Sequence, residues 1–423
     1  MRFVYSVLLY ILIPFVLARL LVRSARNGGY LHRWNERFGY GAAIDDPFVI
    51  WVHAVSVGET RVAAPLIKAL MERYPQCRVL VTTMTPTGSE QVRQILGESV
   101  SHRFVPYDLP GAVRRFLDRA HPRLAVIMET EYWPNLFHGC AARGIPLLIA
   151  NVRMSERSAR AYRRFARLTR ATLDQVTLFG VQSEADARRI RRIGARDGAM
   201  RVTGNMKFEV RFPASLREAA EAQRREWGAQ RPVWIAASTH EGEDQFVLEA
   251  LHSLRQDVPH LLLVLVPRHP ERFGSAAQMA RRAGFQVALR SDWTNRDLPP
   301  GTDVYIGDSM GELLLLYGAA DVAFIGGSLV PRGGHNMLEA CAQGVPVVFG
   351  PHTFNFEEIA ALTLERRAGF CVRSVNELEQ CLRRLLADPN LRFETGQAGQ
   401  RMVAENRGAL DRTLALVEEL LPE

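Results

Sequence analysis

Short apolar runs alternate with amphipathic helical stretches along most of this 423-residue chain, and this alternation restricts the possible folds more than any other feature. In the first half, the apolar runs lie at residues 48–53, 79–83, 124–128, 147–150 and 178–181. The stretch between the first two runs has apolar residues at helical spacing, namely Ala63, Leu66, Ile67 and Leu70. Such a pattern predicts a parallel, doubly wound α/β sheet.

The same alternation restarts after a polar segment at residues 211–231, which has Pro213 and Pro232 near its ends. Further apolar runs follow at residues 233–236, 261–266, 303–306, 322–325 and 345–349. A chain of this length exceeds what one hydrophobic core usually organises. We therefore predict two Rossmann-like domains, 27–212 and 213–423, which face a cleft at the carboxyl ends of their strands. The last helix, 410–421, could pack on either domain.

The N-terminus is almost wholly apolar over residues 3–18, and the run continues past Arg19 through residues 20–22. About 20 apolar residues span a bilayer, so the segment suffices if Arg19 extends to the head groups. Basic residues follow the run without a small-x-small cleavage site, which disfavours a cleaved signal peptide. We predict that residues 1–26 form a single membrane-anchor helix with the remaining chain on the cytoplasmic side. A helix that lies in the membrane interface is the alternative.

The charge balance favours anionic partners, because Lys and Arg (53) outnumber Asp and Glu (45) and give a formal charge of +8. Arginines recur mostly at spacings of three and four between residues 153 and 170, which predicts one basic helical face. Docking onto acidic lipid head groups is one interpretation, and a solvated surface helix is the other. Nucleic acid is not expected as a partner, because no recognised nucleic-acid module accompanies the arginines. The five cysteines form no C-x-x-C pair, so neither a zinc site nor a disulfide framework is indicated.

The strongest chemical signal is the glycine-rich segment at residues 326–340, where an apolar run leads into a loop and then a helix. The loop contains Gly333, Gly334 and His335. Glycines let backbone amides approach an anion, and a helix N-terminus adds unpaired N–H groups, so the segment is typical of a phosphate site. Glu339, about one turn into the helix, can accept hydrogen bonds from ribose hydroxyls. The alternative is a structural loop in which Glu339 interacts with the helix dipole.

Two other segments in this half, VPRHP and GDSMGEL, follow expected strands and so lie where the cleft is predicted. Arg268 in the first offers planar donors for a phosphate or carboxylate. Met310, Gly311 and Glu312 in the second could supply backbone contacts to a base. An ordinary surface arginine is the alternative for Arg268, but the flanking prolines indicate a stiff, shaped loop.

In the first half, WVHAVSVGET ends a strand and starts a helix, with Glu59 near the helix start. A carboxylate there can act as a general base, although Glu is also favoured at helix N-termini because of the dipole. METEYWPN adds Glu129 and Glu131, and GNMKF adds Lys207. Carboxylates and a lysine around one cleft fit a reaction that develops positive charge on a sugar and negative charge on a leaving phosphate. The segment 238–243 looks like a catalytic dyad, but we interpret it as a helix cap with acidic first-turn residues.

With these segments in this order, the chain resembles the 3-deoxy-D-manno-octulosonic acid (Kdo) transferases. The resemblance extends from the apolar N-terminus to near the C-terminus and depends on WVHAVSVGE, METEYWPN, GNMKF, VPRHPERF, GDSMGE and GGSLVPRGGHNMLEA. It implies a GT-B fold, inverting chemistry, CMP-Kdo as donor, and a tetraacyl lipid A precursor (lipid IVA) as acceptor. It also implies a location at acidic lipids of the inner membrane, with acceptor binding by 27–212 and CMP-sugar binding by 213–423. Neither a metal nor another cofactor is expected.

The same resemblance implies roles for individual residues. Glu59 matches the general base that deprotonates the acceptor hydroxyl, and Glu129 and Lys207 match residues that stabilise the transition state. Possible acceptor-side residues are Ser56, Gly58 and Glu131. The CMP-binding segments correspond to Arg268, His269, Met310, Gly311, Glu312, Asn336, Met337, Leu338 and Glu339, with the phosphate beside Gly333, Gly334 and His335.

Two other functions are compatible with these patterns. A GT-B relative that uses a UDP-sugar, or a sugar-nucleotide epimerase, needs a similar nucleotide loop. A membrane-tethered nucleotide-binding scaffold without turnover is the non-enzyme alternative. The carboxylate of Glu59 together with an intact donor loop argues against such a scaffold.

Overall fold

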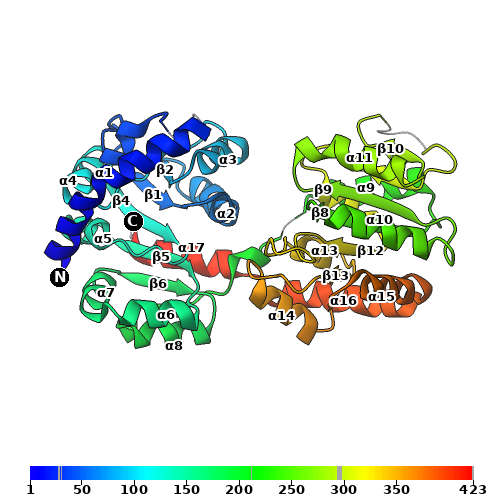
Figure 1. Cartoon of the computed structure of the whole chain (residues 1–423). Coiled ribbons are helices and arrows are strands. Elements are labelled where there is room, and N and C mark those ends of the chain that lie inside the picture. Colours follow the sequence, from blue (N-terminus) through cyan, green and yellow to red (C-terminus); the bar gives the residue numbers. More distant parts are fainter. Residues whose placement is uncertain (27–28, 30, 211, 293–297, 422–423) are drawn as a thin grey trace. The chain divides into compact units, whose positions relative to one another are not determined.

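The computed structural model describes residues 1–26, 29, 31–210, 212–292 and 298–421. The chain divides into two compact units (Figure 1). The first unit comprises Met1–Glu209 together with Arg407–Glu423, and the second comprises Val210–Asn406. The second unit is therefore one continuous segment, whereas the first unit is completed by the C-terminal end of the chain.

The first unit is built on a parallel seven-stranded sheet with the order β3-β2-β1-β4-β5-β6-β7. Its strands are β1 (Val49–His53), β2 (Arg78–Thr83), β3 (Ser101–Phe104), β4 (Pro122–Met128), β5 (Leu147–Val152), β6 (Leu178–Val181) and β7 (Met200–Val202). Every residue of β1 is buried, because helices cover both faces of the sheet. The predicted doubly wound sheet is confirmed.

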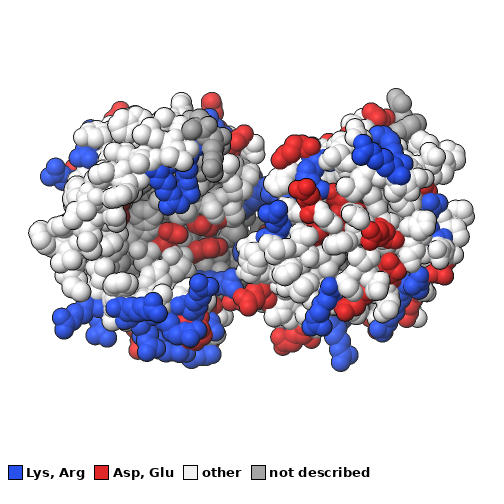
Figure 2. Space-filling view, in the orientation of Figure 1, with Lys and Arg blue, Asp and Glu red and all other residues white. Residues whose placement is uncertain are grey.

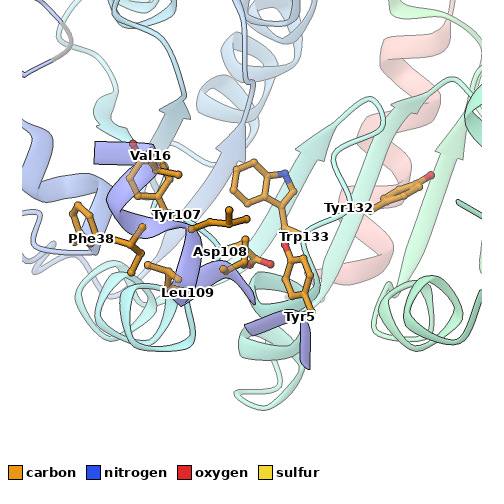
Figure 3. A pocket seen from close by; sticks show the side chains of 11 residues that line it. Tyr5, Val16, Phe38, Tyr107, Asp108, Leu109, Tyr132 and Trp133 are labelled. Atoms are coloured by element: carbon orange, nitrogen blue, oxygen red, sulfur yellow. The ribbon is translucent and has the colours of Figure 1, made fainter. Parts of the chain in front are cut away.

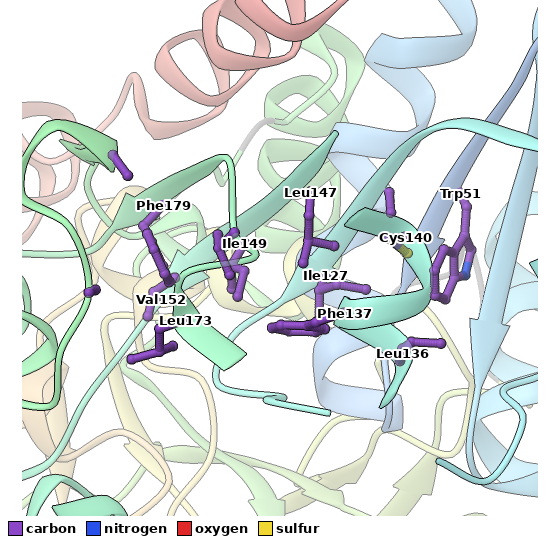
Figure 4. Packing of buried hydrophobic residues seen from close by; sticks show 14 of the residues in the cluster. Trp51, Ile127, Leu136, Phe137, Cys140, Leu147, Ile149, Val152, Leu173 and Phe179 are labelled. Atoms are coloured by element: carbon purple, nitrogen blue, oxygen red, sulfur yellow. The ribbon is translucent and has the colours of Figure 1, made fainter. Parts of the chain in front are cut away.

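Two helical layers enclose this sheet. One face is covered by α4 (Pro110–Ala120), α5 (Pro134–Ala141), α6 (Glu156–Arg163), α7 (Ala166–Leu173) and α8 (Glu184–Arg192), which pack on a core that contains Trp51, Phe137 and Phe179 (Figure 4). The other face is covered by α2 (Val57–Arg73), α3 (Pro86–Leu96) and the C-terminal helix α17 (Ala409–Leu420). Short 3-10 turns, η2 (Trp34–Phe38), η3 (Asp197–Ala199) and η4 (Met206–Phe208), complete the unit.

The second unit repeats this architecture around a sheet with the order β10-β11-β9-β8-β12-β13-β14. Its strands are β8 (Val233–Thr239), β9 (Leu262–Pro267), β10 (Val287–Leu289), β11 (Val304–Ile306), β12 (Val322–Ile325), β13 (Val347–Phe349) and β14 (Gly369–Cys371). The helices are α9 (Ala214–Trp227), α10 (Glu243–Leu254), α11 (Phe273–Arg282), α12 (Leu313–Gly318), α13 (Leu338–Ala342), α14 (Glu357–Glu365), α15 (Val375–Ala387) and α16 (Pro389–Glu405), with the turn η5 (Pro270–Arg272). The helices α10, α11 and α15 pack on one face of the sheet.

The N-terminal helix α1 (Arg2–Arg26) is long and apolar enough to cross a membrane between Arg2 and Ser24. One side of its N-terminal part contacts α5, where Ser6 Oγ donates to Asn135 Oδ1 at 3.0 Å. Most of its remaining apolar surface is exposed. The predicted N-terminal helix is therefore present, and it presents its apolar surface away from the unit.

The arginine-rich stretch differs from the single helical face that its spacing predicted. Two short helices, α6 and α7, replace one long helix, because the chain leaves the helical conformation at Phe165 (φ −116°, ψ 37°). Thr169 Oγ1 closes this break by donating to the carbonyl of Tyr162 at 3.0 Å. Figure 2 shows that Lys and Arg side chains gather over the part of the first unit formed by α6, α7 and α8. The basic surface exists, but it bends at the break.

Candidate active site

Glu59 lies in the first turn of α2, directly after the central strand β1. Ser56 caps the helix, and its hydroxyl accepts from the Glu59 N–H at 3.4 Å and donates to Glu59 Oε1 at 3.0 Å. The Val55 N–H donates to the other carboxylate oxygen, Oε2, at 2.8 Å. The same residue therefore serves as a helix-start residue and holds its carboxylate in a fixed position at the carboxyl end of the sheet.

Two further acids surround this carboxylate, because β1 and β4 are neighbours in the sheet. The pKa of Glu59 is raised to about 7, mainly by burial and also by the charges of Glu129 and Glu131, while the hydrogen bonds from Val55 and Ser56 oppose the shift. A carboxyl group with a pKa near 7 is poised to accept a proton at physiological pH. The structure therefore brings together Glu59 and Glu129, predicted as catalytic residues, and Glu131, predicted for the acceptor side.

The loop after β4 holds both of these acids. Glu129 has a left-handed backbone conformation (φ 58°), which is uncommon for a residue other than glycine and costs about 1–3 kcal/mol where it is imposed. Its N–H donates to the carbonyl of Ala150 at 2.8 Å, which ties the loop to β5. Glu131 accepts from Trp133 Nε1 at 2.8 Å, and burial raises its pKa. Strain of this kind concentrates at functional sites.

Lys207 follows the edge strand β7, yet the chain returns from there toward the centre of the sheet. Asn151 at the end of β5 accepts the Met206 N–H through Oδ1 at 3.0 Å, and Asn205 Oδ1 accepts the Lys207 N–H at 2.9 Å. These bonds place the backbone of Lys207 beside the end of β5, which is the neighbour of β4. Asn151 was not predicted as a site residue, although its place after an expected strand was a usable signal.

In the second unit, three histidines meet at the carboxyl ends of β8, β9 and β12. The rings of His240 and His335 are stacked with centroids 5.1 Å apart, and their Nε2 atoms are 2.8 Å apart, so one ring donates to the other. The ring of His269 stands edge-on to His240 at 5.5 Å. The pKa of His240 is lowered to about 4, mainly by burial and also by the charges of His269, Arg332, Arg272 and Arg268. The cluster therefore presents imidazole N–H groups and guanidinium charge on one side of the sheet.

The glycine-rich loop between β12 and α13 differs from the predicted amide cradle. The buried carboxylate of Glu243 accepts from the N–H groups of Gly327 (2.6 Å), Ser328 (3.0 Å) and Leu329 (3.0 Å). The Gly334 N–H donates to the Gly327 carbonyl at 2.8 Å. These four amides are thus occupied by the protein itself, so an anion in this loop must be bound by groups other than these four amides.

The interpretation of residues 238–243 as a helix cap with acidic first-turn residues is confirmed in part, because α10 begins with Glu243 and Asp244 but no side chain caps it. Gly242 occupies the cap position of α10 in a left-handed conformation and offers no side chain. Glu243 is fully buried and also accepts the His240 N–H at 2.9 Å. Its carboxylate fixes two loops of the second unit, the one that contains His240 and the one after β12, whose residues lie more than 80 positions away in sequence.

The remaining predicted CMP-binding residues separate into side-chain and backbone candidates. Glu312 forms an ion pair with Arg290 (Oε1–Nη2 2.8 Å), which lowers its pKa, so only its backbone is available to a base. Gly311 has a positive φ (85°) and Met310 is exposed beside it. The loop GDSMGE is therefore shaped by a buried arginine, and its exposed part is Met310 and Gly311.

In the segment at the start of α13, too, contacts within the protein hold some of the predicted CMP-binding residues. The side chains of Met337 and Leu338 are fully buried, and the Leu338 N–H donates to Asn336 Oδ1 at 3.1 Å. Asn336 Nδ2 donates to Glu339 Oε1 at 2.9 Å, so these two polar side chains are fixed together. Glu339 lies in the first turn of a five-residue helix rather than one turn into a longer one. Asn336 and Glu339 are thus the members of this segment whose side chains can contact a ligand.

The comparisons with known proteins identify the family. A family model described as 3-deoxy-D-manno-octulosonic-acid transferase (kdotransferase) matches residues 32–210. A 3-deoxy-D-manno-octulosonic acid transferase of Haemophilus influenzae is 41% identical over 423 residues and covers 99% of each chain. This chain belongs to the Kdo transferase family. A second member, from Bordetella pertussis, is 38% identical over 99% of both chains. The protein is accordingly a glycosyltransferase.

Solved structures with low sequence identity share the fold of this transferase. A UDP-GlcNAc 2-epimerase from Neisseria meningitidis superposes with a TM-score of 0.60 at 13% identity, over 88% of this chain and 100% of that one. A glycosyltransferase from Rickettsia africae superposes with a TM-score of 0.56 at 12% identity, over 90% of this chain and 100% of that one. The predicted class, two Rossmann-like units of GT-B type, is confirmed. At 13% identity, the likeness to the epimerase shows a shared fold only. Family membership is shown by the relatives that are 41% and 38% identical.

The motifs of this family member all follow strands at their carboxyl ends. In the first unit they follow β1, β4 and β7, and in the second they follow β9, β11 and β12. Open parallel sheets bind ligands at this edge. His240, directly after β8, and Asn151, at the end of β5, lie at the same edge of their sheets as the motifs.

Proposed function

We propose that this transferase moves Kdo from CMP-Kdo to a tetraacyl lipid A precursor, lipid IVA, in lipopolysaccharide biosynthesis, with inversion at the anomeric carbon. The observation that supports the mechanism best is the buried carboxylate of Glu59, whose pKa lies near 7 beside Glu129 and Glu131. Family membership supports the sugar that is transferred.

The reaction needs one proton acceptor and stabilisation of two developing charges. A hydroxyl of the acceptor attacks the anomeric carbon of Kdo, the bond from that carbon to the phosphate oxygen breaks, and CMP departs with the bonding electron pair. Glu59 takes the hydroxyl proton as the new bond forms. The carboxylate of Glu129 favours the positive charge on the sugar, and Lys207 is assigned to the negative charge of the leaving group.

The donor phosphate is assigned to the second unit. Imidazole N–H groups of His335 or His240 and the guanidinium of Arg268 can bind its oxygens, while Asn336 and Glu339 are assigned to the ribose. A single leaving phosphate carries little charge, and these groups can neutralise it, so we propose a metal-independent reaction. Within the described ranges, no group of three or more His, Cys, Asp or Glu side chains is arranged to hold a metal ion.

Transfer by the purified full chain tests this function directly. We expect mass spectrometry to detect lipid IVA with added Kdo after incubation with CMP-Kdo, at an equal rate in the presence of EDTA. A panel that includes UDP-GlcNAc is expected to give no product. Transfer from the UDP-sugar alone would replace the proposed donor, and absence of turnover with every donor would favour a nucleotide-binding scaffold.

The rate is expected to depend on pH through Glu59. A general base acts in its deprotonated form, and protonation below its pKa removes it. With the pKa at about 7, kcat/KM should fall about tenfold for each pH unit below 7 and level off above it. A pH–rate profile checks this limb, and a profile that stays flat between pH 5 and 7 contradicts the assignment of Glu59.

We propose that the protein is attached to acidic lipids of the inner membrane by α1 and by the arginine-rich surface, with both units on the cytoplasmic side. The helix α5 packs against both α1 and α7, so α1 and the arginine-rich helices share a neighbour in the first unit. Phe165 is 66% exposed at the break between α6 and α7, among exposed arginines. Basic side chains around an exposed aromatic ring are typical of a membrane-interface surface.

Charge reversal tests this surface. The double variant Arg160→Glu/Arg163→Glu is expected to reduce binding to vesicles that contain anionic phospholipid by about tenfold or more, since each arginine near such a surface contributes about 1 kcal/mol. The matched control, Arg281→Glu/Arg282→Glu on α11, should have little effect. Co-sedimentation at low and high salt measures both variants. Equal losses for the two pairs would show that only net charge matters.

A further inference from the structure

A cavity of about 280 Å³ lies between the N-terminal helix and the body of the first unit (Figure 3). Leu9, Ile13 and Val16 line it from α1. The opposite wall contains Phe38, Leu109 and Trp133, from η2 and from the loops that follow β3 and β4. Segments far apart in sequence thus form a mainly apolar site that the candidate active site does not include.

The polar groups at one end of this cavity hold α1 against the unit. The carboxylate of Asp108 accepts the N–H groups of Asn135 (3.0 Å) and Leu136 (2.7 Å) at the start of α5, and it also accepts the hydroxyl of Tyr5. Figure 3 shows the ring of Tyr5 and the indole of Trp133 near Asp108. Because Asp108 and Tyr5 are hydrogen-bonded within the protein, the cavity as a whole offers apolar surface rather than a site for a charged ligand.

The side of α1 that faces away from the cavity is apolar and exposed, which indicates how a ligand could enter. Leu8, Ile11 and Phe15 are 54%, 61% and 71% exposed, on a helix apolar enough to lie in a membrane. With α1 in a bilayer, hydrocarbon surrounds these side chains, and the cavity on the inner side of the helix lies next to that hydrocarbon. A lipid chain can therefore reach the cavity without crossing water.

Trp133 connects the cavity with the candidate base. Its indole forms part of the wall, and its Nε1–H donates to Glu131, whose charge raises the pKa of Glu59. The imidazole of His53, at the end of β1, stands edge-on to the same indole at 6.1 Å. A molecule with a hydroxyl at Glu59 would therefore have its neighbouring groups beside Trp133.

We propose that this cavity binds one acyl chain of the lipid acceptor and so orients the acceptor's sugar toward Glu59. The inference rests on the proposed lipid acceptor. A cavity of about 150 Å³ holds benzene, so 280 Å³ accommodates on the order of ten carbons, which suits part of one acyl chain. A peptide segment would bring N–H and C=O groups that need partners, whereas an acyl chain needs none.

Variants that fill the cavity provide the first test, with the full chain in mixed micelles. Leu9→Trp and, as a second variant, Val16→Trp are expected to lower the preference for tetraacylated over deacylated acceptor, measured as the ratio of kcat/KM values, by about tenfold. The loss should appear in KM for the acylated acceptor. The matched controls Leu8→Trp and Ile11→Trp add the same ring to the exposed side of α1 and should leave the preference unchanged. Thermal unfolding confirms that each variant is folded.

Photo-crosslinking provides a second test that does not depend on turnover. An acceptor analogue with a diazirine in one acyl chain should label residues around Leu109 and Trp133, and Leu9→Trp should abolish this labelling. A phospholipid with the same diazirine should label the site weakly and compete poorly. Equal labelling by the phospholipid would make the cavity a general lipid site and overturn the proposal.

The outcomes separate the inference from the proposed function. If the wild-type enzyme transfers Kdo but Leu9→Trp and Val16→Trp reduce transfer to both acceptors equally, the proposed function stands and the acyl site is wrong. If both variants keep the wild-type preference for the tetraacylated acceptor, the acyl site is also wrong. If the wild-type enzyme transfers to neither acceptor and the analogue labels no residue of the cavity, both proposals are wrong.

Discussion

Replacing Glu59 by glutamine lowers the rate of Kdo transfer by about 10²–10⁴-fold, the usual contribution of a general base, while CMP binding is unchanged. The amide keeps the size of the side chain and one oxygen for the Val55 or Ser56 hydrogen bond, so the fold is retained. It cannot accept the acceptor's proton. Single-turnover rates, with CMP affinity measured by calorimetry, check both parts of this expectation.

The matched control is Glu72→Gln, which changes an exposed acid near the other end of α2 and should leave the rate unaffected. Glu59→Ala is expected to lose transfer as well and to keep CMP binding. Near-normal turnover in either Glu59 variant would remove this residue from the mechanism and leave it as a helix-start residue only.

Replacing Glu243 by alanine is expected to destabilise the second unit and abolish donor binding. The variant leaves the amides of His240, Gly327, Ser328 and Leu329 without their acceptor. Each unsatisfied buried amide costs about 1–3 kcal/mol, so a loss of about 4 kcal/mol or more is expected. The loops that carry His240 and His335 would then separate, and the affinity for CMP would fall with them.

Urea unfolding followed by tryptophan fluorescence measures this loss, and calorimetry measures CMP affinity. Glu241→Ala is the matched control, because Glu241 is exposed two positions earlier. Glu243→Gln should be intermediate, since it keeps one acceptor oxygen but directs an NH₂ group at other donors. If Glu243→Ala were as stable as the wild type, the carboxylate would not be what holds this loop.

Much of the fold could be predicted because the central strands are buried on both faces and read as apolar runs. The edge strands could not be predicted in the same way: β3 (SHRF) and β7 (MRV) contain polar residues, and the short edge strands β10 and β14 were not predicted either. The site could be located for a similar reason, since loops after parallel strands meet at one edge of the sheet.

The chemistry of individual loops was harder to predict. The glycines after β12 indicated an amide cradle, but the group that binds those amides, Glu243, lies more than 80 positions away. His240 was passed over because its partner His335 is 95 positions distant. Sequence spacing predicts contacts within one helix or turn, whereas these contacts depend on which strands become neighbours in the sheet.

The return of α17 to the first unit has a genetic consequence. Leu410, Leu416 and Val417 belong to the core that packs against α2 and β5, so a nonsense mutation shortly after Asn406 would spare every proposed catalytic and CMP-binding residue and still unfold the first unit. Deletion of residues 210–406, by contrast, removes one continuous block. A peptide of residues 407–423 supplied in trans should therefore restore the fold of the truncated protein.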